Sequence, residues 1–146
     1  MIKIAQLPQA ITYPHGTQRY WIENGTIGVV VLIGAGRTEI NEAAQAVYDL
    51  IQEAPNPAHV YVITHAENLG GLTPAVRQTV SDFFAHLPSQ THLTSAIILQ
   101  DSLLHNLLNI FLNGLRRLLK VDLTYRIFRD EASAIAWLKE MKAQNS

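Results

Sequence analysis

Apolar and polar positions follow two different periods along this chain, and they predict strands and helices in turn. Short apolar runs rich in β-branched residues predict strands over 9–13, 19–23, 26–33, 59–64, 93–100 and 123–128. Apolar residues spaced three and four apart predict helices over 40–54, 74–87, 102–120 and 131–142. The predicted order is β-β-β-α-β-α-β-α-β-α, within one domain of residues 1–146.

Turn and capping residues indicate how these elements are connected. Asn24-Gly25 stands between two apolar runs, which predicts a β-hairpin because a type I′ turn needs positive φ at both central positions. An antiparallel start followed by β-α alternation predicts an α/β fold, with a mixed β-sheet that opens with an antiparallel meander and four helices packed on it. The predicted N-caps of the four helices are Thr38 or Asn41, Thr73, Asp101 or Ser102, and Asp130.

The segment Ser102–Lys120 has more apolar surface than a helix on a sheet needs. Its leucines, isoleucine and phenylalanine spread over about 200° of a helical wheel, about twice the usual stripe. Another helix, a second subunit or an apolar ligand is expected to cover the excess. Asparagines and arginines on the same helix predict that it does not cross a membrane. The residues predicted at an interface are Leu108, Leu112, Leu119 and Arg116, with Leu112 and Leu119 at the outer edge.

Composition narrows the classes of function. The chain is 48% hydrophobic and 16% charged with a net charge of −1, which argues against a nucleic-acid-binding surface. It has no cysteine, so disulfides, thiolate metal sites and thiol nucleophiles are excluded. Met1-Ile2-Lys3 does not begin a secretory signal, and no transmembrane segment is predicted. We therefore expect a cytoplasmic protein.

Three local patterns resemble catalytic or metal-binding motifs. Gly34-Ala35-Gly36 lacks the third glycine of a dinucleotide fingerprint, since Glu39 stands there, and a plain strand-to-helix turn is favoured. His65-Ala66-Glu67 matches one half of a zinc-deaminase motif whose cysteines are absent. The six histidines show no ligand spacing, so no metal and no cofactor is predicted.

A small-molecule site is still expected near the end of the 59–64 strand, where open α/β sheets place ligands. A polar loop with no ligand is the competing interpretation. The candidate ligand-binding residues are His65, Glu67, Asn68 and Thr73.

The order of several motifs resembles the SpoIIAA-like proteins, a bacterial group related to STAS and CRAL-TRIO domains. The matching segments are Gly36-Arg37-Thr38, His59–Thr64 leading to Thr73-Pro74-Ala75-Val76-Arg77, Ala96-Ile97-Ile98-Leu99, and Arg126–Ala132 followed by Ala136-Trp137-Leu138.

The resemblance implies an α/β fold with protein partners. Anti-sigma-factor antagonists of the STAS group are phosphorylated on a serine at a helix start, and Thr73 is the matching hydroxyl, so it is a candidate phosphoacceptor. Leu72 precedes it, and the usual Asp-Ser pair is absent. A plain cap role for Thr73 competes with this interpretation.

The expected function is that of a non-enzymatic SpoIIAA-like domain that acts through protein-protein contact, as a homo-oligomer or with a regulatory partner. The alternative is binding of a small apolar molecule or lipid, in a pocket between the sheet and the helices that begin near Thr73 and Ser102. An enzyme that uses His65 and Glu67 as acid and base ranks last, because no catalytic residue set is predicted.

Overall fold

The computed structural model describes residues 10–145, and every predicted element is present in them. The predicted strand start at Gln9 and the segment Met1–Lys3 lie outside the described residues. The strands are β1 (Ile11–Thr12), β2 (Gln18–Ile22), β3 (Ile27–Val31), β4 (His59–His65), β5 (His92–Ile98) and β6 (Leu123–Phe128). The helices are α1 (Arg37–Glu53), α2 (Pro74–Ala85), α3 (Ser102–Leu119) and α4 (Glu131–Gln144).

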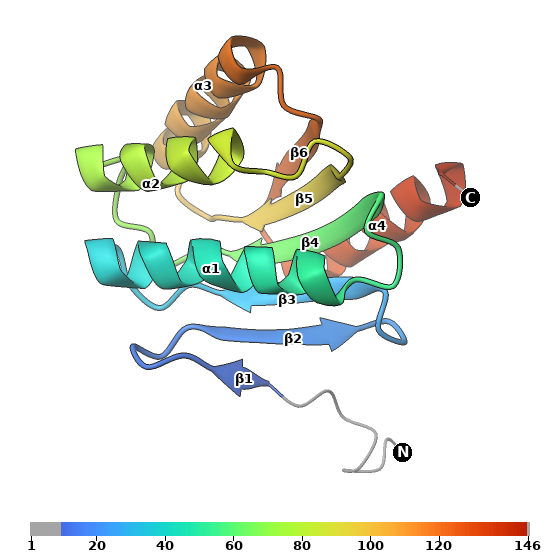
Figure 1. The fold of residues 1–146 in the computed structure, drawn as a ribbon. Helices are drawn as coiled ribbons and strands as arrows, with labels where there is room; N and C mark the ends of the chain where they lie inside the picture. The colour runs from blue at the N-terminus through green and yellow to red at the C-terminus, as the bar shows by residue number, and fades with distance from the viewer. Residues whose placement is uncertain (1–9, 146) are drawn as a thin grey trace.

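The six strands form one mixed sheet in sequence order, β1-β2-β3-β4-β5-β6. The first three are antiparallel, and β3 to β6 are parallel. From β3 to β6, each parallel strand is added at the same edge of the sheet. Right-handed crossovers therefore place α1, α2 and α3 on one face of the sheet. The chain then turns under the sheet, and α4 covers the other face (Figure 1).

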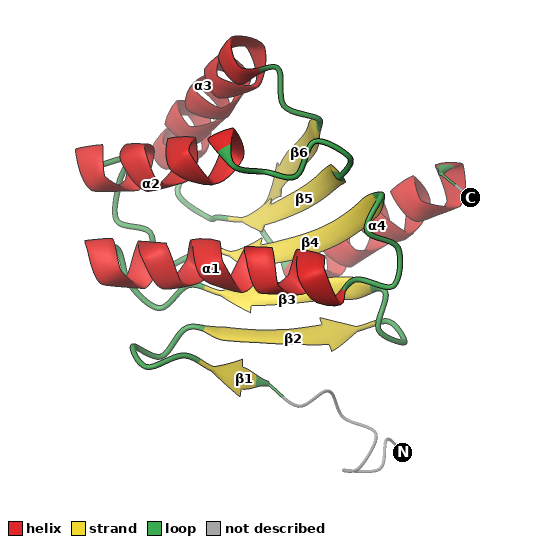
Figure 2. Ribbon diagram, viewed as in Figure 1, coloured by secondary structure: helices red, strands yellow, loops and turns green. Residues whose placement is uncertain are grey.

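Each face of the sheet has its own hydrophobic core. The larger core lies under α1, α2 and α3, and it includes Leu50, Phe84 and Leu108. The smaller core lies between the sheet and α4, around Ile63 and Leu138. Figure 2 shows the strands between these two helical layers. The predicted mixed α/β fold with four packed helices is confirmed.

The first hairpin is present, with a turn longer than predicted. Ile22 pairs with Ile27, so the loop has four residues instead of the two of a type I′ turn. Glu23, Asn24 and Gly25 all have positive φ, at 52°, 58° and 78°. Asn and Gly tolerate positive φ. Glu23 adopts it because the chain reverses direction directly after Ile22.

Helix starts agree with the capping signals in three of the four helices. Thr73, Asp101 and Asp130 each accept a hydrogen bond from a backbone N–H of the first turn, as predicted. The prediction for α1 is wrong, because Thr38 and Asn41 lie inside the helix. Gly36 is the N-cap, and it has no side chain with which to signal the position.

Candidate functional site

The loop after β4 brings together two of the four predicted ligand-binding residues. His65 Nδ1 lies 3.1 Å from Glu67 Oε1, and His65 Nε2 lies 3.7 Å from a carboxylate oxygen of Glu131 on α4. Both ring nitrogens therefore face carboxylates of the same chain. This arrangement links the end of β4 to the start of α4.

The other two predicted residues make separate contacts. Asn68 Nδ2 donates to the carbonyl of Leu32 at 3.2 Å, which ties the β4–α2 loop to the end of β3. Thr73 Oγ1 accepts from the Val76 N–H at 3.2 Å and caps α2. Thr73 is also exposed, so a cap role and access for a kinase are geometrically compatible.

An apolar cavity lies between the sheet and the helices α1, α2 and α3. Its volume is about 160 Å³, and its walls include Val47 of α1, Val80 and Phe84 of α2, and Leu108 of α3. It occupies the place expected for an apolar pocket, with α1 as an additional wall. None of the four predicted ligand-binding residues lines it, because His65 points to the opposite face from Thr64, its neighbour in β4.

The sheet side of this cavity carries hydroxyl groups. Thr64 of β4, Ser95 of β5 and Tyr125 of β6 line it, and all three are only partly buried. Tyr125 Oη donates to Asn109 of α3, with 2.5 Å between Oη and the side-chain oxygen. Because none of the described lining residues is charged, the cavity suits an uncharged molecule.

The helix α3 has two apolar faces. Leu104, Leu108, Leu112 and Leu115 are buried against the larger core. The adjacent side of the helix carries four exposed apolar side chains, which we call the outer face of α3. They are Leu103, Leu107, Ile110 and Leu118, with exposed fractions of 70%, 46%, 71% and 78%.

The prediction of an interface therefore needs correction at Leu108 and Leu112. Leu108 and Leu112 are only 5% and 4% exposed, so both are core residues, and Leu112 is not at the outer edge. Leu119 is partly buried against the same core. Arg116 is bound within the chain, since it donates to the Asn113 side chain at 3.2 Å and stacks over the Tyr125 ring.

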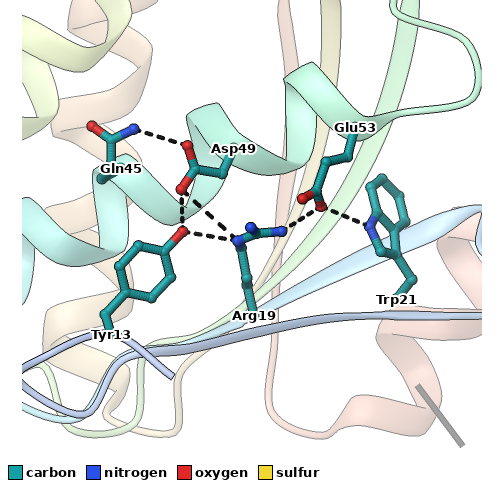
Figure 3. Close-up of polar contacts among 6 residues, drawn as sticks. All are labelled: Tyr13, Arg19, Trp21, Gln45, Asp49 and Glu53. Carbon is teal, nitrogen blue, oxygen red and sulfur yellow. Dashed lines mark hydrogen bonds and ion pairs between the residues drawn. The ribbon is translucent and has the colours of Figure 1, made fainter. Parts of the chain in front are cut away.

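Sequence analysis missed a polar cluster that joins the first hairpin to α1. Tyr13 donates to Asp49, Arg19 donates to Tyr13 and to Glu53, and Trp21 Nε1 donates to Glu53 (Figure 3). We call these five residues the hairpin clamp. Burial is the largest cause that raises the pKa of Tyr13 to about 12, so its phenol stays protonated at neutral pH.

A second contact of the same kind holds the turn between β1 and β2. The Glu42 carboxylate of α1 accepts from the backbone N–H of His15 at 2.7 Å and from that of Thr17 at 3.4 Å. Every polar group in these contacts has a partner within the domain. We therefore assign the hairpin clamp and Glu42 to stability: they hold the antiparallel strands against α1.

The described residues meet the requirements of neither a metal site nor a membrane-spanning helix. Within residues 10–145, no group of three His, Asp or Glu side chains has the arrangement of a metal site. No helix in that part of the chain is long and apolar enough to span a membrane. The candidate functional surfaces are the outer face of α3 and the apolar cavity.

Comparison with known proteins supports the fold. No family model and no curated protein sequence matches the chain. Among solved structures, the chain resembles an anti-sigma factor antagonist from Mycobacterium paratuberculosis, with a TM-score of 0.50 and 11% identity over 88% of this chain and 99% of that chain. The predicted SpoIIAA-like, STAS-type fold is thereby confirmed.

Proposed function

We propose that this chain is a non-enzymatic regulatory domain that acts by contact with another protein through the outer face of α3. The observation that carries the proposal is the exposure of Leu103, Leu107, Ile110 and Leu118 on one side of a single helix. A contiguous exposed apolar surface is typical of a site that a partner covers. The structural neighbour is an anti-sigma factor antagonist by name, so its fold is used for contact with proteins.

The simplest partner is a second copy of the chain, with the two α3 helices antiparallel. The helix contains no acidic residue, and Arg116, Arg117 and Lys120 gather at its C-terminal end. A parallel pair would bring two such basic ends together, whereas an antiparallel pair brings each one to the end that begins with Asp101. The antiparallel arrangement is therefore favoured electrostatically.

Leucines at both ends of the outer face suit this arrangement. Leu103 and Leu118, which are 15 positions apart, would approach each other across the pair. Between them lies Gly114, where an added Cβ would meet no atom within 4 Å, so the partner helix can come close there.

Sedimentation velocity tests the self-association form of the proposal. At about 100 µM, where a complex with a micromolar Kd forms, the wild type should sediment as a dimer and Leu107→Lys as a monomer. Ala136→Lys is the matched control, because Ala136 is exposed on α4 across the sheet, and it should leave the dimer intact. A monomeric wild type would overturn self-association and leave a different protein as the partner.

Single cysteines test the antiparallel orientation, since the chain has none of its own. A mixture of the Leu103→Cys and Leu118→Cys variants should form a mixed disulfide, and neither variant should cross-link efficiently with itself. The two positions are 15 residues apart in sequence and roughly 22 Å apart along the helix, well beyond the Cα–Cα reach of a disulfide, about 7 Å. Efficient self-cross-linking of Leu103→Cys would show a parallel pair instead.

The apolar cavity supports a second candidate function, the binding of a small apolar molecule. Its position between α2, α3 and the sheet, and its lining of aliphatic and aromatic side chains, are typical of a small-molecule site. Native mass spectrometry of freshly purified protein tests this candidate. A bound mass that disappears under denaturing conditions supports it, and a clean apo mass, together with no uptake of added apolar probes, contradicts it.

A further inference from the structure

The hydroxyl groups in the apolar cavity distinguish it from an ordinary packing defect. Ser95 and Thr64 lie on the central strands, and their neighbours on the same face of the sheet are Val62, Leu93 and Ile97. Among the described residues, neither hydroxyl has a hydrogen-bond partner, and both oxygens belong to residues that line the cavity. An apolar cavity with two unpartnered hydroxyls on one wall offers a ligand both contact area and orientation.

The register of the sheet places these two hydroxyls close together. Ser95 of β5 pairs with Val62 of β4, and Thr64 stands two residues further along β4 on the same face. Such diagonal neighbours on adjacent strands lie within about 8 Å. Tyr125 pairs with Ser95 on the other side, but its hydroxyl is already bonded to Asn109. The free hydrogen-bonding capacity therefore lies at Ser95 and Thr64.

The size of the cavity limits its occupant. At about 160 Å³ it is close to a well-studied engineered cavity of about 150 Å³ that binds benzene, and it is below the range of about 300–1,000 Å³ that holds drug-sized ligands. A single ring or a chain of comparable bulk fits, whereas a membrane lipid does not fit inside.

The charge of the cavity limits its occupant further. A carboxylate or an amine buried there would have no ionic partner among the described lining residues. Burial of an unpaired charge is strongly unfavourable, so a neutral molecule is selected. Ser and Thr hydroxyls both donate and accept hydrogen bonds, so they can bind either a hydroxyl or a carbonyl oxygen.

We propose that the cavity binds a small neutral molecule of single-ring size that carries one hydroxyl or carbonyl group, with its oxygen held by Ser95 and Thr64. This inference rests on the second function proposed above and specifies its ligand class. It is independent of the outer face of α3, because none of the four outer-face residues lines the cavity.

Three probes of equal ring size test the proposal by NMR titration of the full chain. Benzyl alcohol is neutral with a hydroxyl, toluene lacks the hydroxyl, and benzoate carries a charge. We expect benzyl alcohol to shift the amide signals of Ser95 and Ile97 and to bind about threefold to tenfold more tightly than toluene, the effect of one hydrogen bond. We expect no saturable shift with benzoate.

Two variants show whether the preference comes from the cavity hydroxyls. Ser95→Ala should reduce the preference for benzyl alcohol over toluene to less than about twofold and leave toluene binding unchanged. Thr94→Val is the matched control, since Thr94 is the adjacent residue and faces the α4 core, and it should keep the full preference.

The outcomes separate the ligand class from the cavity's function. Equal affinity for toluene and benzyl alcohol, or no effect of Ser95→Ala, overturns the proposed ligand class and leaves apolar binding standing. Benzoate binding at the same residues overturns the requirement for a neutral ligand. A lack of binding by all three probes overturns both this inference and the second candidate function.

Discussion

Leu107 and Leu108 are consecutive residues of α3 that point about 100° apart around the helix axis, with 46% of Leu107 exposed and only 5% of Leu108. Leu108 packs in the core with α2 and the sheet, and Leu107 faces outward with Leu103 and Ile110. The pair shows that the wide apolar arc consists of two faces. One face stabilises the fold, and the other is exposed.

Alanine at these two positions should have very different effects on stability. Leu108→Ala removes a buried side chain and leaves a cavity, so the free energy of unfolding should fall by about 2–5 kcal/mol. Leu107→Ala removes an exposed side chain, and the change should stay within about 0.5 kcal/mol. Urea denaturation of the two variants measures this. Equal losses would mean that α3 packs differently from the structure.

The hairpin clamp should make stability sensitive to alkaline pH. Burial and the bond to Asp49 raise the Tyr13 pKa from 10.0 to about 12, so folding favours the protonated phenol. The stabilisation by the protonated phenol is complete below the pKa of tyrosine in the unfolded chain. It is lost as the pH rises through the Tyr13 pKa of the folded state. Tyr13→Phe should be less stable than wild type by about 1 kcal/mol at neutral pH.

The stability curves of Tyr13→Phe and wild type should converge as the pH rises toward 12, the Tyr13 pKa in the folded state. Thermal melts across this range provide the measurement. Near-ultraviolet absorbance should also show one fewer late-titrating phenol in folded Tyr13→Phe than in the folded wild type. A constant stability difference at all pH values would contradict the raised pKa.

The same clamp should weaken in acid. The hydrogen bond from Arg19 is the main cause that lowers the Glu53 pKa, so folding favours the ionised carboxylate. The stabilisation by the ionised Glu53 carboxylate is present above the pKa of glutamate in the unfolded chain. It is lost as the pH falls through the lowered Glu53 pKa of the folded state. Because the Glu53 side chain is 40% exposed, we expect only a small effect.

Thermal melts of Glu53→Gln measure the acid effect. The variant should melt about 1–3 °C below wild type at neutral pH, and the difference should shrink as the pH falls below the usual pKa of glutamate. Glu140→Gln is the matched control, since this exposed glutamate has no ion pair among the described residues, and it should melt like wild type. A difference for Glu53→Gln that persists in acid would contradict the lowered pKa.

Thr73 should be needed as a cap whether or not it is phosphorylated. Thr73→Ala removes the acceptor for the Val76 N–H and should cost about 1 kcal/mol, whereas Thr73→Ser and Thr73→Asp should keep most of the stability. Denaturation of the three variants tests the cap. Phosphopeptide mass spectrometry of the native protein tests the phosphoacceptor proposal separately, and an unmodified Thr73 under all growth conditions would contradict it.

The fold could be predicted because local signals agree with one another. The strand Leu123–Phe128 has the same bounds in prediction and structure, and Thr73-Pro74 begins α2 as its capping chemistry requires. The start of α1 could not be predicted, because Gly36 caps it through backbone conformation alone. Propensity identifies an element, and the side-chain caps locate its first residue.

The functional surfaces were harder to predict, because they depend on distances across the chain. The helical wheel of Ser102–Lys120 shows a wide apolar arc, but it does not show which side of the arc packs against the sheet. The prediction that Leu112 lies at the outer edge is wrong for this reason, because Leu112 is a core residue. Tyr13 and Asp49 are 36 residues apart, and no local pattern connects them. Likewise, the hydroxyls of Thr64 and Ser95 come together only through strand register.

We propose that a protein partner binds at the outer face of α3. A photo-cross-linking amino acid at Leu107, with the same group at Ala136 as the control, tests it most directly in the native host. We expect a discrete cross-linked product from position 107 and none from position 136, with twice the mass of the chain if the partner is a second copy. No product from position 107, or equal products from both positions, would contradict it.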